Sequence, residues 1–516
     1  MHNNTKPSLL FAFFAWALLI LRFGYRYGTG DQVELLPYTL FLHNPALYPT
    51  DFFIQGLHAS VPNERTVMAH LLLPFINHLE AFCFLFQMLA TIVLLLGLEK
   101  IALRFIAARY AAWAAVLLAL IPLNDFGLGN VELYSECLQA GLVAVAIVVW
   151  AVNFFLDRKF LPASALMAAA TFIQVLDGLD IMLVLSALMV WKFLERKITL
   201  GTLVKFLGIY GCTAGVWLLL ILKAKTLNVQ LPEFPYQSPN EFFKILFEFR
   251  HPHHFIFASF SEWKVLTYVL LTVAAFFYFR KRSETMFRFV LISTTALAFY
   301  IVATDVLHWV FIANFQFYKA TQWVKFFSVV AVVSILSSRV ATVTNRRLPK
   351  FWEGAVLISG FALCWIIIFS FSKLLPYTVP YQIAKLKLQD DMLSICEEIK
   401  QSTPLNATFI QPFENTELKF YAERSSYVEF KANVRHKAFA GEWYRRIVEV
   451  YGVDYNSKQT GFPLQQGANN NFYNLSEEKL NQLKGEGVTH VLTRTEHVPA
   501  LGKLVLHNNT YAVYKL

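Results

Sequence analysis

The sequence has few charged residues, few cysteines and no recognised nucleotide-binding motif. Charged side chains make up 16% of the 516 residues and hydrophobic ones 56%, which is too apolar for a soluble enzyme of this length. The five cysteines show no CxxC or Cys/His spacing, so neither a disulfide framework nor a cysteine-based zinc site is expected. No GxxxxGKS or GxxxxGKT phosphate loop occurs. The first apolar run lacks a small-residue cleavage site, so no cleavable signal peptide is expected.

What the sequence does contain is a series of apolar runs of helix length, separated by short charged loops and rich in its 49 Phe and 11 Trp. Such runs indicate a polytopic α-helical membrane protein. The formal net charge of +10 comes largely from Lys and Arg in the loops between these runs. That distribution is typical of membrane topology and argues against nucleic acid as a partner.

About eleven of the runs are predicted to span the membrane. Alternate loops between them are rich in Lys and Arg, and by the positive-inside rule these loops are cytoplasmic. The amino terminus is then inside and the carboxyl-terminal tail outside, and the bacterial inner membrane is the expected location. The predicted spans are residues 8–27, 79–98, 106–123, 136–156, 160–176, 179–194, 202–222, 264–280, 287–304, 322–338 and 352–373.

Two domains are predicted. A transmembrane domain covers residues 1–374, with outer loops at 25–80, 124–136, 223–263 and 305–321, in which 33–47, 67–74 and 240–249 are expected to be interfacial helices. Residues 375–516 have a mixed polar composition and are predicted to form an extracytoplasmic α/β domain. Its strand order is not predicted; its expected strands are 408–410, 426–430, 489–493, 503–506 and 511–516, and its expected helices are 390–401 and 476–484.

The first candidate site is the stretch Gly30-Asp31-Gln32-Val33-Glu34, directly after the first apolar run. Asp31 and Glu34 are three residues apart, so on a helix that begins near Asp31 both side chains would share one face. These residues alone favour a structural interpretation, in which Asp31 caps the helix and Glu34 reaches back to it. Asp51 could likewise be an ordinary turn residue.

A catalytic interpretation rests on the acids that share the predicted outer side. Sugar transfer to a hydroxyl needs a carboxylate base, sometimes with a second carboxylate to orient the acceptor or a metal ion. A lipid-phosphate leaving group needs cations, although any single basic residue at a helix end can equally be an interfacial anchor. The acids in question are Asp31, Glu34, Asp51, Asp125 and Glu132, and the cations are Arg22, Arg26, Lys319 and Lys325.

The outer loop at 223–263 also contains His251-Pro252-His253-His254. These histidines could bind a metal ion or a phosphate, but their spacing matches no metal motif, and a solvated cluster is expected instead. No metal ligands are assigned, and no cofactor is predicted beyond a divalent cation that some such reactions use.

The chain resembles the GT-C type of integral-membrane glycosyltransferases, which use polyprenyl-phosphate sugars on the extracytoplasmic side. The resemblance is carried by Gly30-Asp31-Gln32-Val33-Glu34 after the first helix, the interfacial helices that follow, a second acidic outer loop and the outer α/β domain. More narrowly, the chain is similar to an uncharacterised bacterial GT-C-like membrane family. The motifs that carry this second likeness are Pro37…Asn44-Pro45…Tyr48-Pro49-Thr50-Asp51, Phe420-Tyr421-Ala422-Glu423-Arg424-Ser425 and Phe430-Lys431.

The resemblance implies a role for the first acidic loop. The first-loop acid of such enzymes acts as the base or orients the acceptor, and it corresponds here to Asp31. The usual Asp-Glu or Asp-Asp pair is Asp31-Gln32 in this chain, so Glu34 or Asp51 would have to supply a second carboxylate. The tail residues Arg424, Lys431, Arg445 and Arg446 could contact an anionic substrate, although surface solubility is favoured for them.

The prediction is therefore a membrane glycosyltransferase that moves a sugar from a polyprenyl-phosphate donor to an envelope acceptor (a lipid, glycan or protein). Membrane lipids are expected as further partners, and the expected reaction is a single inverting displacement. The expected catalytic residues are Asp31, Glu34, Asp51 and Asp125, and the expected substrate-binding residues are Arg22, Arg26, Glu132, Lys319 and Lys325. The alternatives are a transporter or flippase for lipid-linked glycans and a non-catalytic envelope assembly protein. A transporter would place its ionisable residues at mid-membrane, and an assembly protein would leave the carboxylates dispersed.

Overall fold

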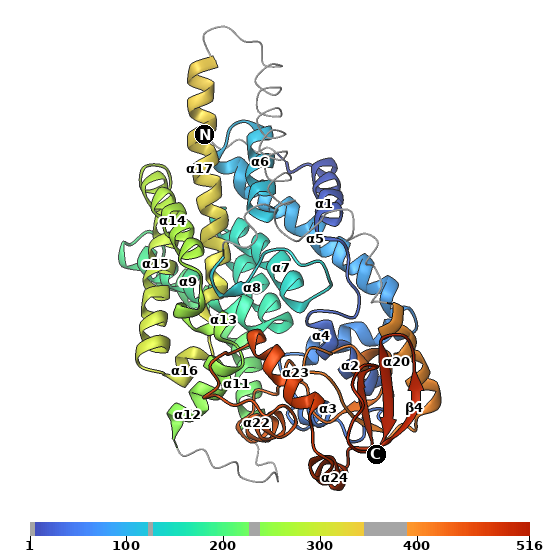
Figure 1. Ribbon diagram of the computed structural model, residues 1–516. Coiled ribbons are helices and arrows are strands. Elements are labelled where there is room, and N and C mark those ends of the chain that lie inside the picture. The colour runs from blue at the N-terminus through green and yellow to red at the C-terminus, as the bar shows by residue number, and fades with distance from the viewer. Residues whose placement is uncertain (1–5, 122–126, 227–237, 345–389) are drawn as a thin grey trace. The chain divides into compact units, whose positions relative to one another are not determined.

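The computed structural model describes residues 6–121, 127–226, 238–344 and 390–516 (Figure 1). The predicted span 352–373, the candidate acid Asp125 and the predicted domain boundary at 374/375 lie outside the described residues. Two compact units are present. The first consists of the described parts of Met1–Tyr25, Phe84–Val216 and His253–Ala384, and the second of those of Arg26–Cys83, Trp217–Pro252 and Lys385–Leu516.

All the regular elements among the described residues of the first unit are helices. Its elements, with α5, α11 and α13 shared between the units, are α1 (Leu9–Phe23), α5 (Leu79–Phe105), α6 (Arg109–Leu120), η3 (Leu128–Asn130), α7 (Ala140–Leu156), α8 (Phe160–Ile173), α9 (Val175–Leu194), α10 (Leu200–Tyr210), η4 (Gly211–Gly215), α11 (Val216–Ala224), α13 (Pro252–Phe255), η6 (Phe257–Ser259), α14 (Glu262–Arg282), α15 (Glu284–Ile301), η7 (Val302–Val306), α16 (Val310–Ala313), η8 (Phe317–Ala320) and α17 (Thr321–Thr344).

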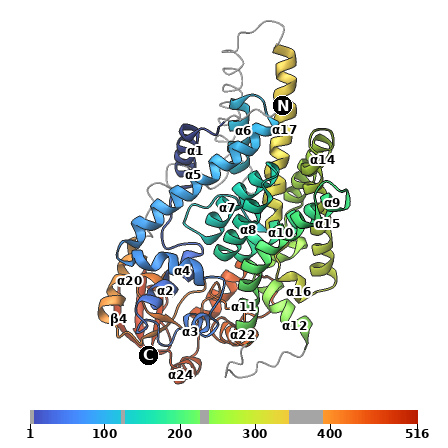
Figure 2. The same ribbon diagram turned by 180° about the vertical axis from the view of Figure 1, so that it is seen from behind.

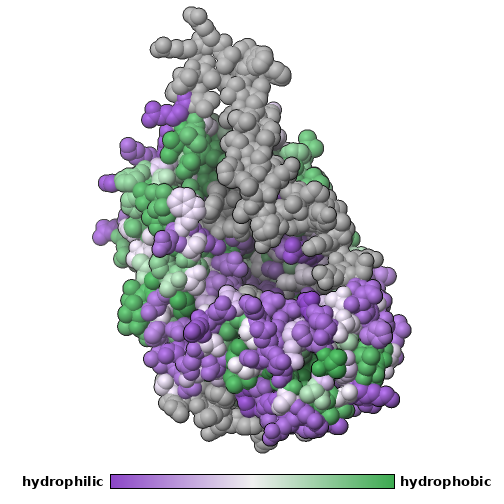
Figure 3. Space-filling model, in the orientation of Figure 1, coloured by the Kyte–Doolittle hydropathy of each residue, from purple (hydrophilic) through white to green (hydrophobic). Residues whose placement is uncertain are grey.

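Five helical stretches among the described residues are long and apolar enough to cross a membrane: Thr66–Phe105, Leu200–Ala224, Glu262–Arg282, Glu284–Val306 and Val310–Arg339. Shorter apolar helices accompany them. On α14 large apolar side chains point outward, with Trp263, Leu270 and Phe277 exposed by 71%, 61% and 60%. Figure 3 shows hydrophobic residues gathered over α14 and α15. A helix satisfies its own backbone hydrogen bonds and can therefore present such a face to lipid. The predicted polytopic helical architecture is confirmed, while the number of spans stays a prediction.

The second unit combines the segments predicted to be outer loops with the carboxyl-terminal sequence. Its further elements are α2 (Gln32–His43), α3 (Phe52–Ala59), α4 (Thr66–Leu72), η1 (Leu73–His78), α12 (Pro239–Phe243), η5 (Lys244–Phe249), α20 (Asp390–Ser402), α21 (Leu418–Tyr421), α22 (Lys437–Tyr451), η9 (Phe462–Leu464), α23 (Gln465–Tyr473), α24 (Glu477–Gly485), β1 (Thr408–Ile410), β2 (Ser425–Ser426), β3 (His490–Arg494), β4 (Lys503–His507) and β5 (Tyr511–Lys515).

The five strands form one mixed sheet in the order β2-β1-β3-β5-β4. Strand β1 pairs in parallel with β2 and β3, whereas β3–β5 and β5–β4 are antiparallel. Helix α20 covers one face, where Ile395 and Ile399 pack with Phe409 and Leu492. The other face is covered by α22, α23 and α24, whose Ile447, Phe472 and Leu483 belong to the core that includes Ile410 and Val491. Figures 1 and 2 both show α20 beside the sheet. The result is a three-layer α/β arrangement.

Four of the five strands and both helices predicted in the tail are close to those observed, whereas the strand predicted at 426–430 is only the short β2. The helix α22 was not expected, although its apolar positions form a strong amphipathic pattern whose buried face includes Phe439, Trp443 and Ile447. The first outer loop is part of this unit as well. The Tyr48 hydroxyl donates to the Lys419 carbonyl over 2.8 Å, and the Phe52 and Phe439 rings lie 5.3 Å apart. The loop and the tail therefore share one core.

Candidate functional site

Asp31 lies at the start of α2 with its carboxylate exposed. Gly28 and Gly30 adopt φ of +67° and +60°, which glycine tolerates best, and so bring the chain sharply into the helix. The capping expected for Asp31 is wrong: the residue has helical φ/ψ of −75° and −8° and its side chain makes no cap hydrogen bond. An effective cap needs an extended backbone. The Asp31 side chain is 63% exposed, and its Oδ1 lies 3.8 Å from Nζ of Lys431.

Glu34 does not reach back to the helix start either. It is buried and forms an ion pair with Arg65, which precedes α4. The Arg65 side chain is 21% exposed. Glu64 and Lys225 form a second, looser pair at 3.9 Å. Glu34 therefore holds an arginine in place, and Asp31 is the exposed carboxylate of this segment.

Five cationic side chains and three carboxylates make up what we call the acid–cation cluster of the second unit: Arg65, Lys225, Arg250, Lys431 and Arg435 with Asp31, Glu34 and Glu64. Burial lowers the pKa of Arg65 to about 10, with Asp31 opposing the shift and Arg435 adding to it. Burial also lowers the pKa of Arg250, and Arg435 and Arg65 add to this effect. Cations crowd one another here, so an incoming anion would relieve their repulsion.

Arg250 positions the segment that faces Asp31. Its Nε donates to the Phe430 carbonyl over 3.2 Å, another guanidinium nitrogen donates to the Lys431 carbonyl, and the group lies 5.7 Å from the Trp443 ring centroid. The ammonium of Lys431 in turn donates to the Gly30 carbonyl. Arg250 therefore holds the backbone of Lys431, whose ammonium lies near Asp31.

Asp51 has a different setting from Asp31. Its Oδ1 accepts from the Ile54 amide over 2.9 Å and caps α3, while Oδ2 accepts from the Ser426 amide over 2.9 Å. Oδ2 also lies 3.2 Å from Nζ of Lys419, and both side chains are buried. The buried Asp51 carboxylate therefore joins the first predicted outer loop to the tail.

The remaining predicted substrate-binding residues lie mostly in the first unit. Lys325 pairs with Glu132 at 2.9 Å, and Lys319 pairs with Asp177 at 2.8 Å. Arg22 lies in the last turn of α1, 5.1 Å from the Phe23 ring centroid. Arg26 belongs to the second unit and is half-buried. No reactive role of these residues is tested by the geometry, and their assignment stays a prediction.

Sequence reasoning missed Arg65, Lys225, Arg250 and Arg435 as members of the site. The sequence contained an indication for three of them, because they are basic residues within predicted outer loops. These three are Arg65, Lys225 and Arg250. Lys and Arg are depleted in translocated loops, so those that remain there deserve a functional explanation. The fourth lies in the tail, where only the tertiary structure brings it near the first loop.

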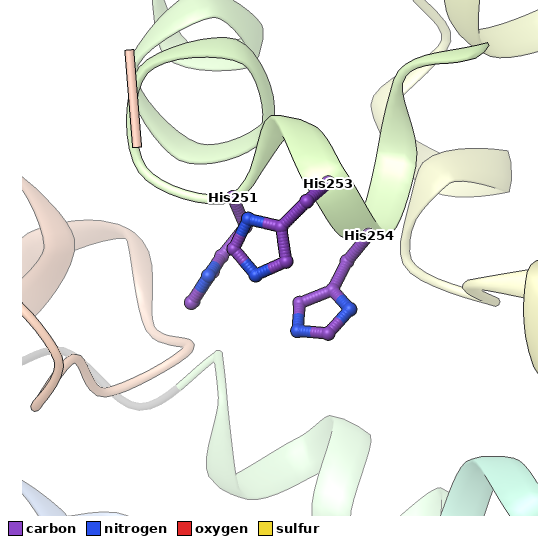
Figure 4. Close-up of side chains that lie close together, drawn as sticks. All are labelled: His251, His253 and His254. Atoms are coloured by element: carbon purple, nitrogen blue, oxygen red, sulfur yellow. The ribbon is translucent and has the colours of Figure 1, made fainter. Parts of the chain in front are cut away.

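The three histidines of the segment His251–His254 lie together (Figure 4). All three side chains are partly buried, and the solvated cluster expected for them stays a prediction. Their possible ligand atoms lie within 4.8 Å of one another. The boundary between the two units falls inside this short segment, so the spacing of the rings reflects its own backbone.

The comparisons with known proteins find few likenesses. The model of a domain of unknown function (DUF6798) matches residues 390–450, which cover α20 to most of α22. No curated protein matches the chain. Among solved structures, the chain is similar to ArnT from Cupriavidus metallidurans, described as bound to undecaprenyl phosphate, with 14% identity and a TM-score of 0.41 over 98% of this chain and 97% of that one. A likeness at this level does not establish a common activity.

Proposed function

We propose that the protein is a membrane glycosyltransferase that transfers a sugar from a polyprenyl-phosphate donor to an envelope acceptor on the extracytoplasmic side. One observation carries the proposal: an exposed carboxylate, Asp31, belongs to a cluster in which cations outnumber acids. A base and an anion-binding site are the two parts that such a transfer needs. The helices that can cross a membrane support a lipid-linked donor.

In the proposed reaction the Asp31 carboxylate accepts the proton of an acceptor hydroxyl as its oxygen attacks the anomeric carbon of the donor sugar. The bond between that carbon and the phosphate oxygen breaks, and the configuration inverts. The lipid phosphate departs with the additional negative charge. Arg65 and Lys431 stabilise this charge, and Arg435 adds to the local positive potential. Asp31 then releases its proton to water.

The other acids have supporting roles in this proposal. Glu34 positions the Arg65 guanidinium, and Asp51 holds the loop that carries Asp31 against the tail. Asp125 is proposed to assist as an acid. The residues proposed to contact the donor or its lipid are Arg22, Arg26, Glu132, Lys319 and Lys325. No metal ion is required by the step described, because the cations of the chain supply the charge that the phosphate needs.

The principal rival is a flippase or transporter for lipid-linked glycans. Such a protein could also bind a lipid phosphate, but it would not need a base at Asp31. The described cluster lies in the predicted outer loops and the tail, not within the candidate membrane-spanning helices. This position favours transfer over transport. A non-catalytic assembly protein would not need cations crowded around an exposed acid.

The test is sugar transfer by the purified chain in lipid, with radiolabelled polyprenyl-phosphate sugars and an envelope extract. Asp31→Asn keeps the size of the side chain and removes the base, so we expect transfer to fall by a factor of about 100 or more. Glu262→Gln is the matched control, because Glu262 is another exposed carboxylate in the first turn of a helix. Transfer that persists in Asp31→Asn, or wild-type protein that transfers no sugar, would reject the proposal.

A further inference from the structure

The segment at the start of α13 gathers three imidazoles in one place. His253 and His254 lie on neighbouring positions of α13 with ring centroids 4.2 Å apart, and His251 precedes the helix by one residue. Figure 4 shows the three side chains clustered on one side of the segment. Pro252 begins α13, where a proline fits the first helical position and restricts the backbone between His251 and His253.

The tautomer of His254 follows from its partner. Its Nδ1 lies 2.6 Å from the carbonyl oxygen of Gly129, and a carbonyl oxygen can only accept a hydrogen bond. Nδ1 therefore carries the hydrogen, and in the neutral ring Nε2 carries the lone pair. Histidines that bind metals commonly donate their other ring nitrogen to a carbonyl in this way, which orients the ring and raises its basicity.

We propose that His251, His253 and His254 bind one divalent metal ion of the zinc type. Three neutral imidazoles suit zinc and its neighbours among the transition metals, whereas Mg²⁺ and Ca²⁺ prefer oxygen ligands. Zinc–nitrogen bonds of about 2.0–2.1 Å require donor atoms about 3.4 Å apart. The possible ligand atoms now lie within 4.8 Å of one another, so a bound ion would draw them closer together. Three protein ligands leave a tetrahedral ion one open position.

This site is independent of the transfer reaction proposed above, and it is tested by metal binding alone. The full-length chain is purified in detergent without a polyhistidine tag, stripped with a chelator and titrated with Co²⁺, whose visible absorption reports coordination. We expect one equivalent of Co²⁺ to bind and Zn²⁺ to displace it. His253→Ala and His254→Ala should each weaken binding at least tenfold.

The control is His507→Ala, which removes an exposed histidine of β4. We expect it to bind Co²⁺ as the wild type does. Helical circular dichroism and a single elution peak verify that each variant is folded. If a variant is not folded, the stoichiometry of Co²⁺ binding by the wild type tests the proposal. Absence of stoichiometric binding by the wild type overturns the proposal, as do His253→Ala and His254→Ala variants that retain its affinity.

Discussion

Asp51 and Lys419 form a buried ion pair between the first outer loop and the tail, with Nζ of Lys419 3.2 Å from Oδ2 of Asp51. The same ammonium lies 3.4 Å from Oε2 of Glu429. Glu429 also accepts hydrogen bonds from Ser426 and Gln411. One cation thus lies between two carboxylates. Because all three groups are buried, removal of the cation would leave uncompensated charges and destabilise this unit.

Lys419→Met should destabilise the second unit strongly. The substitution preserves much of the apolar stem but leaves Asp51 and Glu429 buried without their cation, which costs about 3–5 kcal/mol for a buried pair that loses one partner. Thermal unfolding in detergent measures the loss. Lys515→Met, at an exposed position in β5, should unfold like the wild type. Equal melting temperatures for both variants would show that the ion pair contributes little.

Glu429→Gln should change how stability depends on pH. Burial raises the pKa of Glu429, with Lys419 opposing this and Asp51 adding to it. The folded state therefore holds the proton more tightly than the unfolded state. The contribution of the Glu429 carboxyl to the free energy of unfolding is fully present below the ordinary glutamate pKa. This contribution is lost as pH rises through the raised pKa of Glu429 in the folded protein. Glutamine does not titrate, so the variant should lose this decline and be more stable than the wild type at neutral pH.

Melting temperatures between about pH 5 and 8 test this expectation. Glu477→Gln removes an exposed carboxylate at the start of α24 and serves as the control, which should retain the wild-type profile. A Glu429→Gln variant that is less stable than the wild type across the whole range would mean that the carboxylate stabilises the network even when it is charged.

Gly28→Ala should disturb the turn that precedes Asp31. A Cβ at Gly28 would lie 2.4 Å from Oη of Tyr421, and φ there is +67°. The Tyr421 hydroxyl also donates to the Tyr27 carbonyl over 3.0 Å. Strain and displacement of the ring together should cost about 1–3 kcal/mol. Gly467→Ala is the matched control, since Gly467 lies within α23 with nothing near its missing Cβ, and it should be neutral or slightly stabilising.

Arg65→Gln should weaken binding of the lipid-phosphate donor. A lost charged hydrogen bond to phosphate corresponds to about 1.5–3 kcal/mol, or roughly a tenfold to hundredfold increase in KM. Arg65→Lys retains the charge and should lose less. Lys503→Gln, at an exposed position in β4, is the control and should leave KM unchanged. An unchanged KM in Arg65→Gln would remove Arg65 from the anion site.

The helical membrane architecture was predictable because hydropathy is a local property. Apolar runs of helix length became α5, α7, α14, α15 and α17. The tail strands were predictable for a similar reason, since a short apolar stretch bounded by turn residues predicts a strand of a few residues. The strand order was not, because the pairing of β1 with both β2 and β3 depends on contacts between residues far apart in sequence.

The sequence by itself determined which segments could cross a membrane and that Asp31 would follow the first of them at the start of a helix. Only the tertiary structure decided which side chains lie near that acid. Whether Asp31 caps α2 depends on its backbone angles, and whether Arg65, Arg250 and Lys431 gather with it depends on the packing of the outer loops with the tail. Electrostatic interactions act through space and fall with distance, so a site assembled from distant segments leaves no local pattern in the chain.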